Sequence, residues 1–167
     1  VEMVAGLGFF DGMHLGHQAI ASQVVELAAS LGRVPALVTF DRHPLSIVKP
    51  EAVPLLLTTA EERRQDMWDL GIEAVVELVF DGSLARLEPE EVVKGILVGQ
   101  LKVIAVAAGE DFTFGNKSRG TTELLAKDGP SWGLKSVIKV PPVEAGGGKV
   151  SSTRIRRLLQ EGDVEAA

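Results

Sequence analysis

Short apolar runs alternate with amphipathic segments along most of the chain. The apolar runs are rich in Val, Ile, Leu and Ala and predict buried strands over residues 3–7, 34–40, 74–80, 102–107 and 134–140. The amphipathic segments predict helices over residues 18–31, 58–70, 121–127 and 152–160, and a further helix that opens at Pro89. This alternation predicts one α/β domain over residues 1–167, Rossmann-like, with a doubly wound sheet of about five parallel strands.

The composition is that of an ordinary globular chain and excludes several classes of protein. Of the 167 residues, 46% are hydrophobic and 24% are charged, and no apolar run is long enough to cross a bilayer, so we expect no membrane association. The chain has no cysteine, which excludes disulfides and thiolate metal sites and fits a cytoplasmic protein.

Charge is distributed unevenly along the chain. The net charge of −6 argues against a broad surface for nucleic acid. One basic cluster stands near the C-terminal end and consists of Lys149, Arg154, Arg156 and Arg157. An acidic chain with one local basic cluster suits a small anionic ligand better than a polyanion.

Residues 8–17 (GFFDGMHLGH) are the most informative segment. They follow the first predicted strand and lead into the first predicted helix, so unpaired backbone N–H groups and the positive end of the helix dipole should face one crevice. Gly12 and Gly16 allow a ligand to approach the backbone. His14 and His17, three residues apart, add donors on one helical face. The segment therefore predicts a triphosphate site.

The same segment has two alternative interpretations, a dinucleotide site and a metal site. Gly6 and Gly8 begin a G-x-G dinucleotide pattern, although Asp11 stands where a third glycine is needed and its carboxylate would repel a pyrophosphate. The two histidines could instead bind a metal ion with His43, although no carboxylate has the helical spacing of a metalloprotease motif.

Residues 150–156 (VSSTRIR) form the second motif. Their hydroxyl groups stand where a helix N-cap belongs, but capping accounts for only one of the three. Arginine at a helix start opposes the dipole, and that cost is understandable if an anion lies between the helix N-terminus and a guanidinium. The motif therefore predicts a second anion contact.

Residues 109–115 (GEDFTFG) form the third motif and follow a predicted strand. Two acids beside two aromatic side chains at a loop mouth suit a stacked ring with hydroxyls or ring nitrogens to bind. The alternative is a turn that closes over a small hydrophobic cluster.

Taken in order, the segments GFFDGMHLGH, TFDRHP, GEDFTFG and SSTRIRRLLQEGDVEAA resemble the N-terminal FMN adenylyltransferase (FAD synthetase) domain of bacterial bifunctional riboflavin kinase/FAD synthetase. The H-x-G-H element alone marks the wider nucleotidylyltransferase superfamily, and the other elements make the resemblance specific. It spans nearly all of the chain. It implies that the second domain of the family, a riboflavin kinase joined in cis, begins after Ala167 and is absent from this chain.

The resemblance implies the reaction ATP + FMN → FAD + pyrophosphate, with Mg²⁺ held largely by the phosphates and no protein ligand assigned. The catalytic residues that it implies are His14, His17 and Arg156, with His17 closest to the transition-state charge. The ATP-binding residues that it implies are Gly8, Phe10, Gly16, Asp111, Ser152 and Thr153. The flavin-binding residues that it implies are His43 and Phe114. We expect Asp11 to order the first loop.

The residues themselves permit this chemistry. The phosphate of FMN is already an anionic nucleophile, so an in-line displacement needs positioning and charge neutralisation but no strong general base. Two alternatives stay open: a sister enzyme that acts on nicotinamide mononucleotide or phosphopantetheine, and a flavin- or nucleotide-binding module without turnover. The extended SSTRIR helix favours the flavin branch, and the presence of His14, His17 and Arg156 counts against the module.

Overall fold

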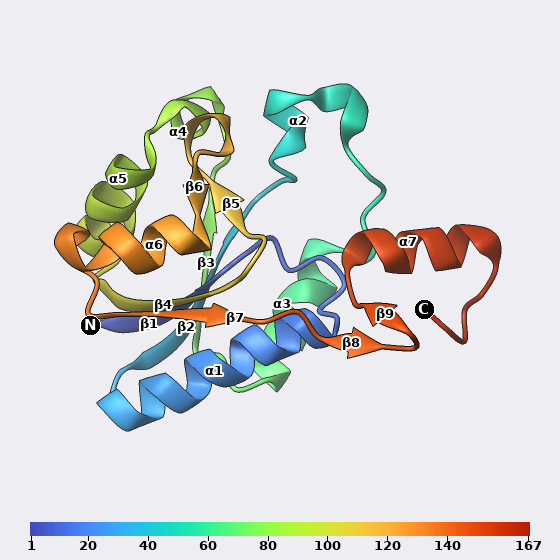
Figure 1. Cartoon of the computed structure of the whole chain (residues 1–167), viewed down its shortest axis with the longest axis horizontal. Coiled ribbons are helices and arrows are strands. Elements are labelled where there is room, and N and C mark those ends of the chain that lie inside the picture. Colours follow the sequence, from blue (N-terminus) through green and yellow to red (C-terminus); the bar gives the residue numbers. More distant parts are fainter.

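The five apolar runs form one parallel sheet. A computed structural model describes all of residues 1–167 and places the strands in the order β3-β2-β1-β4-β7 (Figure 1). The strands are β1 (Met3–Leu7), β2 (Val34–Phe40), β3 (Ala74–Leu78), β4 (Val103–Gly109) and β7 (Ser136–Val140). All four neighbouring pairs run parallel. The predicted Rossmann-like α/β fold is thereby confirmed.

Helices cover both faces of the sheet (Figure 1). The helices are α1 (Leu15–Leu31), α3 (Ala60–Asp69), α5 (Pro89–Glu91), the π-helical segment η2 (Val92–Gln100) that continues α5, and α6 (Thr122–Asp128). On one face α1 and α3 bury a core around Val24, Leu37 and Met67, and on the other η2 and α6 bury a core around Val93 and Leu125. No helix is both long enough and apolar enough to cross a membrane.

The last helix stands apart from these layers. α7 (Ser152–Glu161) lies beyond the carboxyl edge of the sheet and is joined to β7 by the small β8 (Glu144–Ala145) and β9 (Gly148–Lys149) hairpin (Figure 1). The guanidinium of Arg154 donates to the carbonyls of Ala145 (2.6 Å) and Gly148 (2.7 Å), which fixes this hairpin against α7.

Side-chain caps decide where the helices begin. α1 starts three residues before its predicted start because His14 Nδ1 accepts hydrogen bonds from the N–H groups of Gly16 (3.1 Å) and His17 (3.4 Å). α3 starts with the capping box that the sequence indicates, in which Thr59 and Glu62 cap each other. Ser151 caps α7 by accepting the N–H of Arg154.

Several short elements have no counterpart among the predicted ones. They are α2 (Leu45–Val48), α4 (Gly82–Arg86), β5 (Thr113–Phe114), β6 (Gly120–Thr121), β8 and β9. β3 also ends at Leu78, before its predicted end at residue 80, because Phe80 donates its N–H to the Asp41 carboxylate (2.8 Å) and not to a neighbouring strand.

The strand order fixes where a ligand can enter. β1 lies between β2 and β4. β2 and β3 extend the sheet on one side of β1, and β4 and β7 extend it on the other. In open sheets of this kind the crevice lies at the carboxyl ends of the two strands where the order reverses, which here are β1 and β4.

Candidate active site

Two cavities meet at the carboxyl edge of the sheet. The first, which we call the histidine cavity, has a volume of about 410 Å³ and is lined by polar residues that include His14, His17, Asp111, Lys149 and Ser152. The second, the aromatic cavity, has a volume of about 460 Å³ and is lined mostly by apolar residues, among them Phe9, Phe40, Phe112 and Phe114, together with His43. Four residues line both cavities, namely Leu7, Phe9, Asp111 and Phe112.

The two histidines of the first motif stack on each other. Their ring centroids are 3.6 Å apart with an angle of 20° between the rings. His14 accepts with Nδ1, so in the neutral ring its proton is on Nε2. His17 packs against the edge of Phe10, and its Nδ1 is buried without a hydrogen-bond partner. The backbone N–H groups of Gly16 and His17, expected to face a ligand, are instead bonded to His14.

Burial keeps both imidazoles neutral. Burial, together with the nearby His14, lowers the pKa of His17 to about 3. Burial also lowers the pKa of His14. At neutral pH the pair therefore offers N–H donors and not positive charges to whatever enters the histidine cavity.

The low pKa of His17 predicts a loss of stability in mild acid. Above pH 6.5 His17 is neutral in both the folded and the unfolded chain, and it does not lower the free energy of unfolding. Between pH 6.5 and 3 only the unfolded chain takes up a proton on His17, so the free energy of unfolding falls as the pH falls. Between pH 6.5 and 5 we expect His17 to lower the free energy of unfolding by about 1.5 kcal/mol. Urea unfolding of the wild type and of His17→Gln at both pH values measures this, since only the difference between the two proteins belongs to His17. Parallel losses in the two proteins would contradict the expectation.

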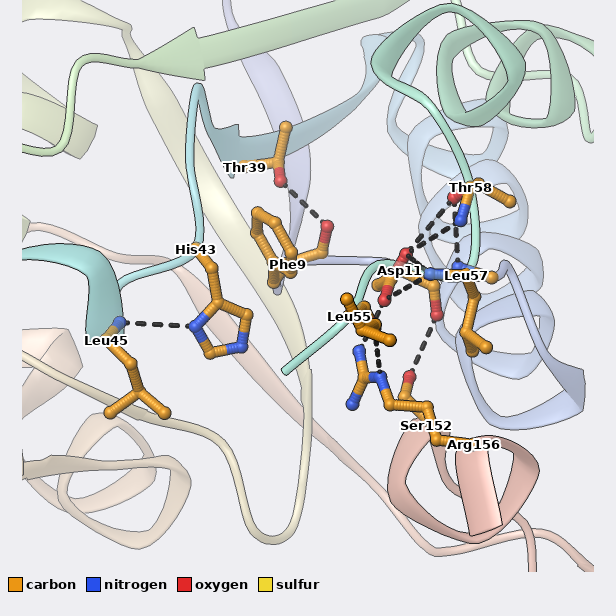
Figure 2. Close-up of polar contacts among 11 residues, drawn as sticks. Phe9, Asp11, Thr39, His43, Leu45, Leu55, Leu57, Thr58, Ser152 and Arg156 are labelled. Carbon is orange, nitrogen blue, oxygen red and sulfur yellow. Dashed lines mark hydrogen bonds and ion pairs between the residues drawn. The ribbon is translucent and has the colours of Figure 1, made fainter. Parts of the chain in front are cut away.

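Asp11 ties the first loop to the segment before α3 (Figure 2). Its carboxylate is 2% exposed and accepts the N–H groups of Leu57 (3.0 Å) and Thr58 (3.1 Å). Burial alone would raise the pKa of Asp11, but these two N–H groups and the Arg156 guanidinium outweigh it and hold the pKa below its ordinary value. The expectation that Asp11 orders the first loop agrees with these contacts.

α7 is attached to the same carboxylate. Arg156 Nη2 forms a buried ion pair with Asp11 Oδ2, and Arg156 Nε donates to the Leu55 carbonyl (2.7 Å). Ser152 Oγ donates to the Asp11 carbonyl (2.8 Å). The second motif therefore lies against the first, although 145 positions separate Asp11 from Arg156 (Figure 2).

Most of the residues expected at the site line the cavities. Those expected at ATP that line the histidine cavity are Gly8, His14, Gly16, His17, Asp111 and Ser152. His43 and Phe114, expected at the flavin, line the aromatic cavity. Three others line neither. The Phe10 side chain is fully buried against His17, Thr153 is exposed on α7, and Arg156 pairs with Asp11. The Arg156 guanidinium is engaged by Asp11 and by the Leu55 carbonyl.

Two charged residues were not assigned to the site from the sequence. Lys149 and Asp111 both line the histidine cavity, and Lys149 donates to Asp111 (2.5 Å). This hydrogen bond is the main reason that the pKa of Asp111 is lowered. Arg63 of α3 is buried behind Phe9. Helical spacing gives a signal for Arg63, because it lies four residues before the buried Met67 and so on the apolar face of its helix.

Comparison with known proteins places the chain in a family. Residues 1–154 match the family model described as FAD synthetase. The chain belongs to this family. A relative from Listeria monocytogenes is 37% identical over 170 residues, which cover 100% of this chain and 52% of that protein. A relative from Bacillus subtilis is 33% identical over 168 residues, which cover 99% and 52%. Both are named bifunctional riboflavin kinase/FMN adenylyltransferase, and the chain spans about half of their length.

A solved structure shares the fold of this FAD synthetase domain. The crystal structure of a macrolide-efflux protein from Streptococcus pneumoniae superposes with a TM-score of 0.87 and 32% identity, over 99% of this chain and 55% of that one. That protein is named for efflux, whereas the family model and the curated relatives are named for flavin chemistry. The resemblance expected from the four motifs is confirmed.

Proposed function

We propose that the chain transfers the adenylyl group of ATP to the phosphate of FMN and releases pyrophosphate. The observation that carries the proposal is the junction of the two cavities. A polar cavity with stacked imidazoles suits a nucleoside triphosphate, and an apolar cavity with aromatic walls suits the isoalloxazine ring. Because the cavities share Phe9 and Phe112, the two ligands would meet at their common border. The names of the relatives support the same reaction.

The reaction needs one displacement at phosphorus. An oxygen of the FMN phosphate attacks the α-phosphorus of ATP, a new P–O bond forms, and the bond to the β-phosphate oxygen breaks, so that pyrophosphate leaves with the electron pair. His14 Nε2–H and the neutral His17 would donate hydrogen bonds to phosphate oxygens at the reacting centre. Ser152, held by the Asp11 carbonyl, would position the far end of the triphosphate.

The side chains of the site fit a Mg²⁺ that enters bound to ATP and takes most of its ligands from the phosphates and water. The chain contains no group of three or more His, Asp or Glu side chains close enough to hold a metal ion. Mg²⁺ prefers oxygen ligands and commonly uses substrate phosphates, waters and one or two carboxylates. Asp111 lines both cavities and is the carboxylate that would share the ion. When bound, the ion supplies neutralisation of the phosphate charge.

Conversion of FMN to FAD is the direct test. The purified chain is incubated with ATP, Mg²⁺ and FMN, and the flavins are separated by chromatography while pyrophosphate is assayed in parallel. We expect FAD and pyrophosphate in equal amounts, and no adenylylated product from riboflavin, which lacks the phosphate nucleophile. Adenylylation of nicotinamide mononucleotide or phosphopantetheine without FAD would move the assignment to a sister enzyme. Binding of ATP and FMN without any product would identify a non-catalytic module.

The natural partner that we propose is a riboflavin kinase domain joined in cis. The curated relatives carry that activity in their names, and this chain matches about half of each. A riboflavin kinase produces FMN, which is the acceptor of the proposed reaction.

A further inference from the structure

Arg63 is a buried cation for which the chain supplies no anion. Its residue exposure is 2%, and Nε and Nη1 are both buried without a hydrogen-bond partner. Its neighbour Arg64 differs on both counts, since its side chain is 42% exposed and pairs with Glu77 at 2.9 Å. Burial of an unpaired charge is costly, so the position of Arg63 needs an explanation beyond packing.

The guanidinium of Arg63 lies directly against Phe9. Its Cζ is 4.6 Å from the centroid of the Phe9 ring, a cation–π distance. His43 contacts the same ring edge-on, with centroids 5.0 Å apart. Phe9 lines both cavities and Arg63 lines neither. The positive charge of Arg63 therefore lies against Phe9, which borders the junction of the histidine cavity and the aromatic cavity.

The nearest carboxylates do not neutralise Arg63. Glu77 and Asp11 attract it at longer range, but Glu77 is paired with Arg64, and Asp11 is paired with Arg156 and accepts backbone N–H groups. A charge in a water-poor interior acts over a longer distance than one at the surface. Arg63 therefore has no carboxylate of the chain that is paired with it alone.

We propose that Arg63 is a positioning residue that favours flavins carrying a phosphate. It holds Phe9 at the border of the cavities and supplies, from behind that ring, positive charge where the phosphate of FMN must approach ATP. The inference rests on the proposed function, because it assigns the aromatic cavity to the flavin. Riboflavin has the same ring system without the phosphate and gains nothing from this charge, so Arg63 would discriminate between the two flavins.

Binding of the two flavins to the complete chain tests this proposal without turnover. Dissociation constants for FMN and riboflavin are measured by flavin fluorescence for the wild type, Arg63→Met, Arg63→Lys and the control Arg33→Met. We expect Arg63→Met to weaken FMN binding about tenfold and to leave riboflavin binding within about twofold. Arg63→Lys should restore most of the loss because it keeps the charge. Arg33→Met should change neither constant, because Arg33 pairs with Glu2 on the surface and lines neither cavity.

A purely structural role for Arg63 predicts a different result. If Arg63 only supports Phe9, its removal weakens FMN and riboflavin equally, and that outcome overturns the proposal, as does unchanged binding of both. Should Arg63→Met fail to fold, Arg63→Gln keeps polarity and length while removing the charge, and the same comparison applies. If the wild type makes no FAD, the proposed function itself is rejected. If the wild type makes FAD and the Arg63 variants keep the wild-type preference for FMN, only the role of Arg63 is rejected.

Discussion

The substitution His17→Ala should lower kcat for FAD formation by about a thousandfold or more, while ATP binds within about tenfold of the wild-type affinity. The imidazole is buried in the wall of the histidine cavity, stacked on His14 and supported by Phe10, so its donor is held in place before the substrates arrive. A preorganised donor acts on charge that develops in the transition state and contributes less to ground-state binding. Steady-state kinetics and calorimetric titration with ATP separate the two effects.

Gln18 provides a matched control for His17. It is the next residue of α1, its side chain donates to the Met13 carbonyl (2.9 Å), and it lines neither the histidine cavity nor the aromatic cavity. Gln18→Ala should leave kcat within about threefold of wild type. Turnover that survives His17→Ala, or an equal loss in the Gln18 variant, would remove His17 from the chemistry.

The second large effect concerns stability. Asp11→Ala should lower the free energy of unfolding by about 3 kcal/mol, because it leaves the Arg156 guanidinium and the N–H groups of Leu57 and Thr58 buried without their acceptor. Urea unfolding at neutral pH measures the loss. The pKa of Asp11 is lowered in the folded chain, so its contribution is present above the ordinary aspartate value and is lost as the pH falls below it.

An exposed ion pair gives the comparison. Glu90 and Lys94 pair on the surface, with side chains 53% and 51% exposed, and Glu90→Ala should cost no more than about 0.5 kcal/mol. The double variant Asp11→Ala/Arg156→Met should lose less than the sum of the single variants, since removing Arg156 also removes the unpaired charge. Additive losses, or a loss for Asp11→Ala as small as that for Glu90→Ala, would show that the buried pair does not hold α7 in place.

Much of the architecture follows from local patterns. The bounds of β1 and β2 agree with the predicted runs because each strand is apolar and ends at polar or glycine residues. The start of α1 differs because a histidine acts as its N-cap, a role that residue preferences assign to Ser, Thr, Asp or Asn. The short helices α2 and α4 contain too few residues for a helical period to be recognised.

The site was predictable to the extent that topology decides it. Parallel strands end at one edge, so the loops after β1 and β4 had to meet, and the histidines and Asp111 do line one cavity. The pairing of Asp11 with Arg156 was not predictable, since it depends on how α7 docks and not on spacing. Helical spacing places Arg63 on an apolar helix face, but its lack of a paired carboxylate was not predictable, because it depends on Glu77 and Asp11 being engaged by other arginines.

The tie between the first loop and the last helix also bears on biosynthesis. A ribosome delivers Asp11 early and Arg156 145 residues later, so the sheet can assemble while the first loop still lacks its contact with α7. Closing a contact of this span is slow compared with local helix formation. Any activity that depends on this contact, including the one proposed above, would therefore appear only after α7 has emerged and docked on the first loop.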